Sequence, residues 1–180
     1  MDVIITGWIN SWAGSSGMLD KVIIAITQFG VPLLVLFVGL QWWSVRDRAH
    51  VRHACIAAGL SFLLGLGMNQ IVILFFQRIR PCDAGVTHLI IDRSVDASFP
   101  SDHATACFAI ATTLLIQGLK RRGAIAAAAA LVISLSRVYV GTHYVTDIIG
   151  GAAMAMTATT LVNVLYREGT RVDRLVTAIL

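Results

Sequence analysis

Charged side chains are scarce in this chain. Of its 180 residues, 13% are Asp, Glu, Lys or Arg, whereas 57% are hydrophobic and the mean hydropathy is +0.77. A soluble domain carries about 25% charged residues, and a larger core does not explain the deficit because a small protein exposes proportionally more surface. The composition therefore excludes an ordinary soluble domain and predicts an integral membrane protein.

Cysteine is also scarce, and the three in the chain are Cys55, Cys82 and Cys107. Cys55 and Cys107 fall inside apolar runs, where a cysteine behaves as a small hydrophobic residue. Cys82 stands alone in a polar stretch, so we expect no disulfide framework.

The N-terminal residues 1–17 lack the basic start and the unbroken apolar run of a cleavable signal peptide. They contain Trp8 and Trp12, which are four residues apart and would share one face of a helix. Because tryptophan is enriched at membrane interfaces, the segment predicts a short helix lying in the headgroup region.

Five apolar runs follow, and Pro32 in the first of them is a candidate kink. The runs cover residues 22–43, 54–76, 103–119, 124–139 and 144–165. A helix needs about 20 residues to cross the hydrocarbon, so the short third and fourth runs qualify only if they begin in polar, protein-lined surroundings. We predict an all-α fold, a polytopic membrane helix bundle of about five transmembrane helices plus the N-terminal interfacial helix. Residues 1–180 would form a single domain.

Basic residues indicate the orientation of these helices. Nine of the 14 lie in the first inter-helix loop, the third loop and the tail: Arg46, Arg48, Arg52, Lys120, Arg121, Arg122, Arg167, Arg171 and Arg174. With five spans these segments share one side, which the positive-inside rule makes cytoplasmic. The net charge of +4 is therefore interpreted as a signal of orientation and not of nucleic-acid binding. The N-terminus and residues 78–102 and 140–142 then share the outer side.

Polar motifs converge on that outer side. We expect Arg80-Pro81 to end the second span and Pro100-Ser101-Asp102-His103 to open the third. The stretch from Ser136-Arg137 through His143 to Asp147 joins the fourth and fifth. Each motif has a plain structural explanation: an arginine at a helix end, a serine cap, a packed histidine–aspartate pair. Their joint occurrence favours a functional site, because ionisable groups near membrane depth are costly and usually functional.

The chemistry of these groups fits phosphate. His143 and Asp147 are four residues apart, so a helix would place them on one face, with the carboxylate orienting the imidazole. The third and fifth helices start on the outer side, where their free amides would point at an anion. Arg80 and Arg137 can fork around phosphate oxygens. Two histidines and scattered aspartates do not form a closed metal-ligand set, which favours covalent transfer through an imidazole over a metal-activated water.

The chain resembles the type 2 phosphatidic acid phosphatases, membrane lipid phosphatases that share their site pattern with vanadium haloperoxidases. The family's third motif is Ser-Arg, five residues, His, three residues, Asp, and it is matched in full by Ser136, Arg137, His143 and Asp147. The second motif, Pro-Ser-Gly-His, corresponds to residues 100–103, and Arg80-Pro81 match the end of the first. The resemblance covers about residues 69–151.

The resemblance implies a role for each matched residue. His143 would attack phosphorus and form a phosphohistidine, with Asp147 holding its ring. His103 would protonate the leaving oxygen and then activate the hydrolytic water. Phosphate oxygens would be bound by Arg80, Arg137 and Ser101. The family needs no metal, and we expect no cofactor.

Two positions depart from the family pattern. Ile73 occupies the place of the first motif's lysine, which removes one cation from the phosphate pocket. Arg78 would point elsewhere on a regular helix, because it is two residues from Arg80, and Gln77 is a weak substitute. Asp102 replaces glycine and would favour the protonated form of the neighbouring histidine. An aspartate here is similar to the bacitracin-resistance type of undecaprenyl-diphosphatase within the family.

Other residues carry weaker signals. Arg93 is a candidate for binding a second phosphate, although loop charges are usually solvated. His88 lies in the same loop and could touch a headgroup, but a solvated histidine is more usual. His50 and His53 accompany the inner basic loop and are interpreted as its polar flank.

The resemblance implies an enzyme of the bacterial inner membrane with its active site on the outer, periplasmic side. It would hydrolyse undecaprenyl diphosphate to undecaprenyl phosphate and inorganic phosphate, as cell-wall synthesis requires. Its expected partners are that lipid and the membrane; the sequence does not indicate the oligomeric state. Phosphatases for phosphatidylglycerophosphate or a lipid A 1-phosphate remain alternatives, as does a small anion or lipid transporter. A transporter would have no need for His103 together with the His143–Asp147 pair, and a chain so short and lipophilic disfavours a vanadate-dependent oxidase.

Overall fold

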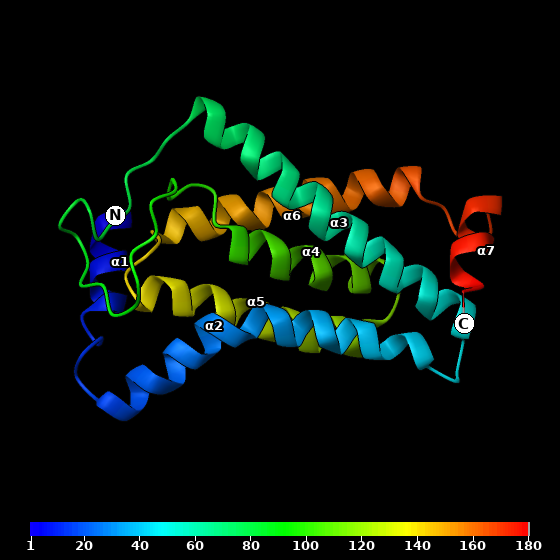
Figure 1. Cartoon of the computed structure of the whole chain (residues 1–180), viewed down its shortest axis with the longest axis horizontal. Helices are drawn as coiled ribbons and strands as arrows, with labels where there is room; N and C mark the ends of the chain where they lie inside the picture. The colour runs from blue at the N-terminus through cyan, green and yellow to red at the C-terminus, as the bar shows by residue number, and fades with distance from the viewer. Residues whose placement is uncertain (180) are drawn as a thin grey trace.

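The computed structural model describes residues 1–179, and within them every regular element is helical. The elements are α1 (Asp2–Asn10), α2 (Gly17–Leu40) with the 3-10 turn η1 (Gln41–Trp43), α3 (Arg48–Phe75), α4 (Asp102–Ile116), α5 (Lys120–Tyr139), α6 (Val145–Leu165) and α7 (Arg171–Thr177). In Figure 1 the long helices run side by side, while α1 and α7 lie at opposite ends. We call these the α1 end and the α7 end.

In the part of the chain that the structure describes, four helical segments are long and apolar enough to cross a membrane: Gly17–Trp43, Arg48–Phe75, Lys120–Tyr139 and Val145–Leu165. The fifth, α4, has 15 residues, and the segment before it is buried at Ser98 and Ser101. It therefore begins inside protein, as a run shorter than about 17 residues requires. The predicted helical membrane bundle with an N-terminal helix is confirmed.

The helix boundaries differ from the apolar runs in a consistent direction. At the basic loops, α3 begins at Arg48 and α5 at Lys120, six and four residues before the runs at positions 54 and 124. The long stems of Lys and Arg let a helix extend into the headgroup region while the charges stay in water. The short α7 was not predicted at all. The helix α2 continues through Pro32 and changes direction along its length (Figure 1).

The expectation that Arg80-Pro81 ends the second span is wrong, because α3 ends at Phe75. Proline disfavours helical geometry in the residue before it, and Arg80 instead turns its side chain inward to backbone carbonyls. Residues 76–101 form a long irregular segment that covers the α1 end of the bundle (Figure 1).

Small side chains let α4 pack centrally against α3, α5 and α6. Ala54, Ala58, Ala111 and Ala126 belong to its fully or almost fully buried core. Where α4 and α6 begin, a Cβ on Gly151 would stand 2.6 Å from the carbonyl oxygen of Ser101, so this approach requires glycine. Close packing thereby brings the starts of both helices together.

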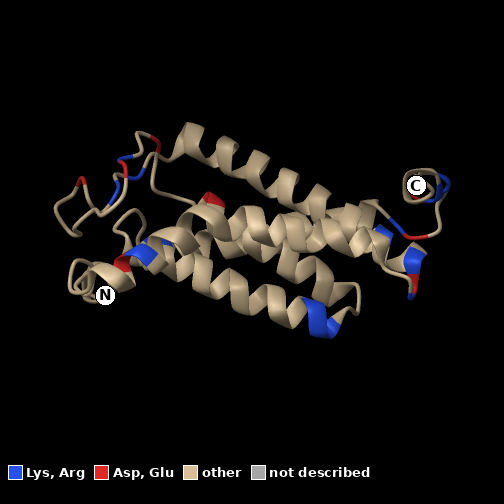
Figure 2. Ribbon diagram, turned by 60° about the horizontal axis from the view of Figure 1, so that its bottom comes forward, with Lys and Arg blue, Asp and Glu red and all other residues tan. Residues whose placement is uncertain are grey.

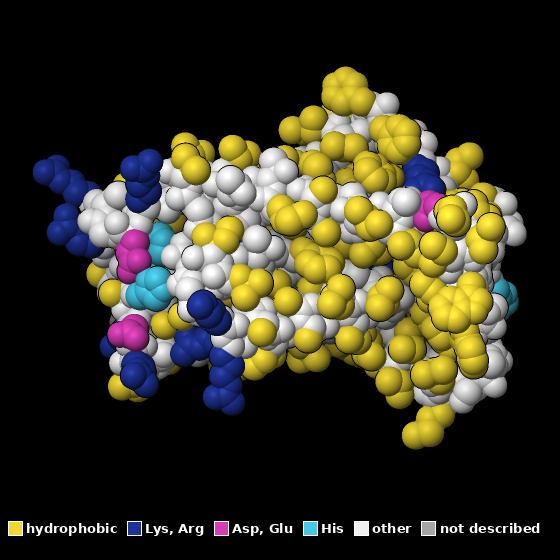
Figure 3. All heavy atoms as spheres, turned by 180° about the vertical axis from the view of Figure 1, so that it is seen from behind, with side chains coloured by type: hydrophobic (Ala, Val, Ile, Leu, Met, Phe, Trp, Pro, Cys, Tyr) yellow, Lys and Arg dark blue, Asp and Glu magenta, His cyan; other side chains and the backbone are white. Residues whose placement is uncertain are grey.

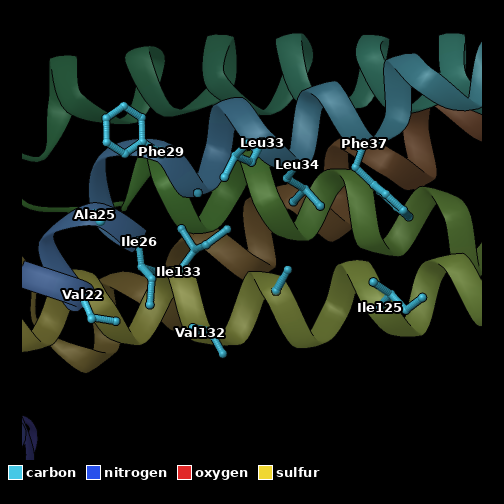
Figure 4. Close-up of a pocket in the computed structure, with 12 residues that line it drawn as sticks. Val22, Ala25, Ile26, Phe29, Leu33, Leu34, Phe37, Ile125, Val132 and Ile133 are labelled. Carbon is cyan, nitrogen blue, oxygen red and sulfur yellow. The ribbon is translucent and has the colours of Figure 1, made fainter. Parts of the chain in front are cut away.

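Charged residues lie mainly toward the two ends of the bundle, as the coloured ribbon in Figure 2 shows. On the face in Figure 3, apolar side chains cover the middle and most basic side chains gather at the α7 end. An apolar groove of about 760 Å³ runs between α2 and α5 (Figure 4), lined by side chains from Val22 to Phe37 and from Ile125 to Ile133. A surface of this kind fits hydrocarbon, not water.

Candidate active site

Side chains from separate segments of the chain meet around a polar cavity of about 150 Å³ at the α1 end. Its lining consists of Ile73 from α3, the loop residues Arg80, Ser94, Asp96, Ala97 and Pro100, Asp102 and His103 from α4, Arg137 from α5, and His143. Four residues predicted from the sequence for catalysis or phosphate binding, Arg80, His103, Arg137 and His143, are thus brought together.

The ring of His143 is held in one tautomer. Its Nδ1 lies 2.8 Å from the carbonyl oxygen of Ser98, which can only accept, so Nδ1 carries the proton of the neutral ring. Nε2 is then unprotonated, and it lies 3.5 Å from Nη1 of Arg80. The imidazole is buried, with its free nitrogen beside a cation.

Asp147 approaches this ring, but not by the predicted route. The helix α6 begins only at Val145, so His143 lies before it, and the expectation that the two share a helical face is wrong. Asp147 sits in the first turn, where its Oδ2 accepts the backbone N–H of Tyr144 at 2.8 Å. Capping the helix start in this way fixes Oδ2 at 3.6 Å from His143 Nδ1.

The Asp147 carboxylate has no exposed surface and is held by several donors. Oδ2 also accepts the hydroxyl of Ser98 at 2.6 Å, and Oδ1 accepts Nη1 of Arg78 at 2.7 Å. Ser98 therefore touches both members of the pair, the imidazole through its carbonyl and the carboxylate through its hydroxyl. Sequence reasoning found neither Ser98 nor this use of Arg78.

The two arginines of the cavity differ in how they are satisfied. Arg80, 4% exposed, donates to the carbonyl oxygens of Thr142 at 2.9 Å and Asp96 at 3.0 Å. Arg137 is 8% exposed, and its buried Nε has no hydrogen-bond partner among the described residues. A buried donor on a cation is stabilised by an acceptor, and an anion bound in the cavity would supply one.

Ser101 has the same character. It stands at the N-cap of α4, yet its side chain makes no capping bond, and its fully buried Oγ has no partner among residues 1–179. The Ser101 hydroxyl therefore does not cap the helix, and the plain structural explanation of this residue does not apply. Its backbone N–H donates to the carbonyl of Asp147 at 3.1 Å, which ties the starts of α4 and α6 together.

Asp102 and Ile73 form a different part of the wall. The Asp102 carboxylate accepts Nδ2 of Asn69 at 2.7 Å, so the extra acid is tied to α3. Asn69 Nδ2 also donates to Thr105 at 2.9 Å. Ile73 lines the cavity at the position of the family's lysine, which makes this wall apolar.

Two weaker candidates lie outside the cavity. Gln77 is exposed and contributes to a neighbouring surface hollow. The Arg93 side chain is 67% exposed and pairs with Asp83 at 2.6 Å. Within residues 1–179, no group of three or more His, Cys, Asp or Glu side chains is placed to hold a metal ion.

Electrostatics favour the neutral form of the His143 ring. Burial lowers the pKa of His143 below its ordinary value of 6.5, the Asp147 carboxylate opposes this, and the charges of Arg137 and Arg80 add to the lowering. A neutral imidazole with a free Nε2 is a nucleophile, and nearby guanidinium groups can bind the oxygens of the group that it attacks.

The structure combines helices that are long and apolar enough to cross a membrane with a polar cavity lined by two imidazoles and two guanidinium groups. The family model described as PAP2 superfamily matches residues 54–171. The chain therefore belongs to the PAP2 superfamily, and it is a membrane lipid phosphatase. This confirms the resemblance read from the motifs.

Similar proteins include two curated bacterial relatives. Undecaprenyl-diphosphatase BcrC of Bacillus subtilis is 30% identical over 143 residues, which cover 78% of this chain and 72% of the relative. The putative undecaprenyl-diphosphatase YbjG of Escherichia coli is 32% identical over 126 residues, covering 70% and 61%.

Solved structures support the fold. A PAP2-type phosphatidylglycerolphosphate phosphatase from Bacillus subtilis superposes with a TM-score of 0.69 at 24% identity, covering 94% of this chain and 86% of that one. LpxE of Aquifex aeolicus superposes with a TM-score of 0.67 at 22% identity, covering 89% of this chain and 93% of that one.

Proposed function

We propose that this lipid phosphatase hydrolyses undecaprenyl diphosphate, releasing inorganic phosphate and leaving the monophosphate. The observation that carries the proposal is the His143 ring, whose protonated Nδ1 is held by Ser98 and whose free Nε2 faces the arginines of the cavity. The choice of lipid follows the similarity to curated undecaprenyl-diphosphatases.

The proposed reaction has two steps. His143 Nε2 attacks the terminal phosphorus, the bond from phosphorus to the bridging oxygen breaks, and His103 gives that oxygen its proton. His103 then takes a proton from a water that attacks the phosphohistidine, so inorganic phosphate leaves and both rings return to their starting state. Positive charge that develops on the His143 ring is stabilised by the Ser98 carbonyl and the Asp147 carboxylate.

The phosphate oxygens would occupy the unpaired donors. Arg137 Nε and Ser101 Oγ are buried without partners among the described residues, and Arg80 Nη1 lies beside the attacking nitrogen. Donors fixed in place before the reaction stabilise charge in the transition state without reorganising. With Ile73 at the lysine position, the cavity offers one cation fewer than the family pattern.

We also propose that the α1 end faces the outside of a bacterial inner membrane. The basic loops at residues 46–52 and 120–122 and the basic tail lie at the α7 end, which the positive-inside rule makes cytoplasmic. The diphosphate headgroup would then enter from the outer leaflet, with the prenyl chain left in lipid.

Another lipid phosphate is the second candidate, since a relative named phosphatidylglycerophosphatase B from Bacillus subtilis is 31% identical over 157 residues. Rates of phosphate release by the purified enzyme decide between them, with undecaprenyl diphosphate, phosphatidylglycerophosphate, a lipid A 1-phosphate and phosphatidic acid as substrates. The proposal expects the highest kcat/KM with the prenyl diphosphate. A higher value with a phosphomonoester lipid would overturn it, and binding of all four without phosphate release would indicate a transporter.

A further inference from the structure

The N-terminal helix α1 turns its polar side to the protein and its apolar side outward. Its inward residues Asp2, Thr6 and Asn10 recur every four positions, so they form one stripe along the helix. Ile4 and Trp8 are 72% and 66% exposed. The exposed apolar side chains suit a helix whose outer face contacts lipid. The polar stripe on the opposite side contacts the protein.

The stripe contacts the end of α5 and the start of α6, on either side of the break that contains His143. Asn10 Nδ2 donates to the carbonyls of Tyr139 at 2.7 Å and His88 at 2.9 Å, and its Oδ1 accepts the His88 N–H at 2.7 Å. Thr6 Oγ1 accepts the N–H of Val145 at 3.2 Å. These contacts fix α1 across the start of α6.

Asp2, the first residue of the stripe, contacts Thr146 and Arg78, which lie next to Asp147. Its Oδ1 accepts the N–H of Thr146 at 3.1 Å, and its Oδ2 accepts the Thr146 hydroxyl at 2.5 Å and Arg78 Nη2 at 2.7 Å. Burial raises the pKa of Asp2, but hydrogen bonds from Thr146 and Arg78 outweigh it and hold the pKa below the ordinary value. Asp2 is thus a carboxylate at neutral pH.

Arg78 links Asp2 to the buried carboxylate of Asp147, because it forms an ion pair with each of them. One guanidinium nitrogen, Nη2, meets Asp2, while the other, Nη1, meets Oδ1 of Asp147 at 2.7 Å and the hydroxyl of Thr146 at 2.6 Å. The guanidinium also stacks 3.9 Å from the ring centroid of Tyr144. Since the guanidinium is planar, two fixed ends determine the orientation of the whole group.

We propose that Asp2 and Arg78 are positioning residues of the phosphatase site. Through the two ion pairs Asp2–Arg78 and Arg78–Asp147, α1 contributes to the orientation of the Asp147 carboxylate. The inference rests on the proposed function, in which Asp147 orients His143. With Oδ1 held by Arg78, Oδ2 stays toward the imidazole; without that contact the carboxylate can rotate, and its buried charge loses its cation. Asp2 in turn keeps the guanidinium, which is 26% exposed, from moving into solvent.

The test measures kcat and KM separately for Arg78→Gln, Arg78→Lys, Asp2→Asn and the double variant Asp2→Asn with Arg78→Gln. We expect Arg78→Gln to lower kcat about 30-fold and Asp2→Asn about 5-fold, with KM changed less than about 3-fold, because charged hydrogen bonds to Asp147 or its support are lost. Arg78→Lys should recover part of kcat. In the double variant the two losses should not multiply, because Asp2 acts through Arg78.

Asp20→Asn is the matched control. Asp20 is another N-terminal carboxylate, and it accepts the Tyr139 hydroxyl at 2.9 Å outside the chain of contacts to Asp147. Its kcat should stay within about 2-fold of the unmodified protein. An Arg78→Gln protein with unchanged kcat would overturn the inference, as would a loss confined to KM or independent multiplication in the double variant. Asp2→Asn, nearly identical in shape, keeps the test decisive if Arg78→Gln does not fold.

Trapping of the phosphoenzyme separates this inference from the proposed function. If His143→Ala keeps its activity, the proposed mechanism fails, and with it the role assigned to Asp2 and Arg78. If His143→Ala is inactive while Asp2→Asn and Arg78→Gln form phosphoenzyme at the unmodified rate, the positioning inference alone fails. Slower phosphoenzyme formation in both variants, with unchanged substrate binding, is the expected result.

Discussion

Within residues 1–179, two histidine–aspartate pairs are buried, one at each end of the bundle. At the α1 end, His143 Nδ1 lies 3.6 Å from Asp147; at the α7 end, His53 Nδ1 lies 2.8 Å from Asp173 Oδ1. By distance alone the second pair is the better hydrogen bond. The residue types are the same, so the difference between them lies in their surroundings.

Other side chains contact the His53 ring on one face and at both of its nitrogens. Its ring stacks on Tyr166 at 4.7 Å between centroids, and its Nε2 lies 3.3 Å from the side-chain nitrogen of Gln117. Asp173 also accepts the Tyr166 hydroxyl and the Gly169 N–H, at 2.6 and 2.7 Å. The pair therefore docks α7 onto α3, and the earlier interpretation of His53 as polar flank is wrong. Of the two pairs, that of His143 lines a cavity beside guanidinium groups, and this is why we propose it as the reaction site.

Replacing the two histidines gives the sharpest contrast between the ends. We expect His143→Ala to lower kcat by at least about 10⁴-fold, because the nucleophile itself is removed. His53→Ala should keep kcat per folded molecule within about 3-fold, yet lose about 2 kcal/mol of stability as Asp173 loses its partner. Phosphate release and thermal unfolding in detergent measure both. Comparable losses of kcat in the two variants would erase the distinction.

Replacing the two aspartates separates orientation from docking. Asp147→Asn should lower kcat about 10³-fold with little change in KM, because an amide cannot stabilise the charge that develops on the His143 ring. Asp173→Asn should leave kcat within about 2-fold and expose the chain near α7 to limited proteolysis. The contrast fails if the Asp147 variant turns over normally.

Much of the fold and part of the site could be predicted from the sequence, for identifiable reasons. Apolar runs and clustered basic residues are local signals, and they located all five long helices. The positions of Arg80, His103 and His143 followed from motif spacing and from topology that brings alternate loops together. Their assigned roles stay predictions that the experiments above address.

What sequence reasoning missed depends on contacts between distant residues. His53 and Asp173 are 120 positions apart, and Thr146 and Asp2 are 144 apart. The role of Arg78 was discarded because a helix was assumed to reach it, although the proline at position 81 was a local signal that α3 stops earlier. The polar stripe of α1 was visible in the sequence, but its partners were not.

Ser98 offers a finer test, because it supports only the α1 pair. Ser98→Ala removes the hydroxyl that donates to Asp147 Oδ2 while its backbone carbonyl still holds His143. We expect kcat to fall about 10- to 30-fold, the lower end of what one hydrogen bond to a charged group is worth. Ser134→Ala is the matched control, since its buried hydroxyl has no partner among residues 1–179, and it should stay within about 2-fold. If Ser98→Ala and Ser134→Ala lowered kcat equally, the loss would come from altered packing and not from the hydrogen bond to Asp147.

The smallest expected effect is a shift in the pH dependence of kcat/KM. In the proposed mechanism the attacking His143 ring must be neutral, so activity is expected above the pKa of His143 and is lost as pH falls through it. Burial lowers this pKa below 6.5, Asp147 opposes, and Arg137 and Arg80 add to the lowering, which places the acidic limb of the profile below pH 6.5. Asp147→Asn removes the opposing charge and should move the limb to lower pH, whereas Arg137→Gln should move it higher. Asp173→Asn, at the other end of the bundle, should leave it in place; a limb that moves in the Asp173 variant would mean that the two pairs are not independent.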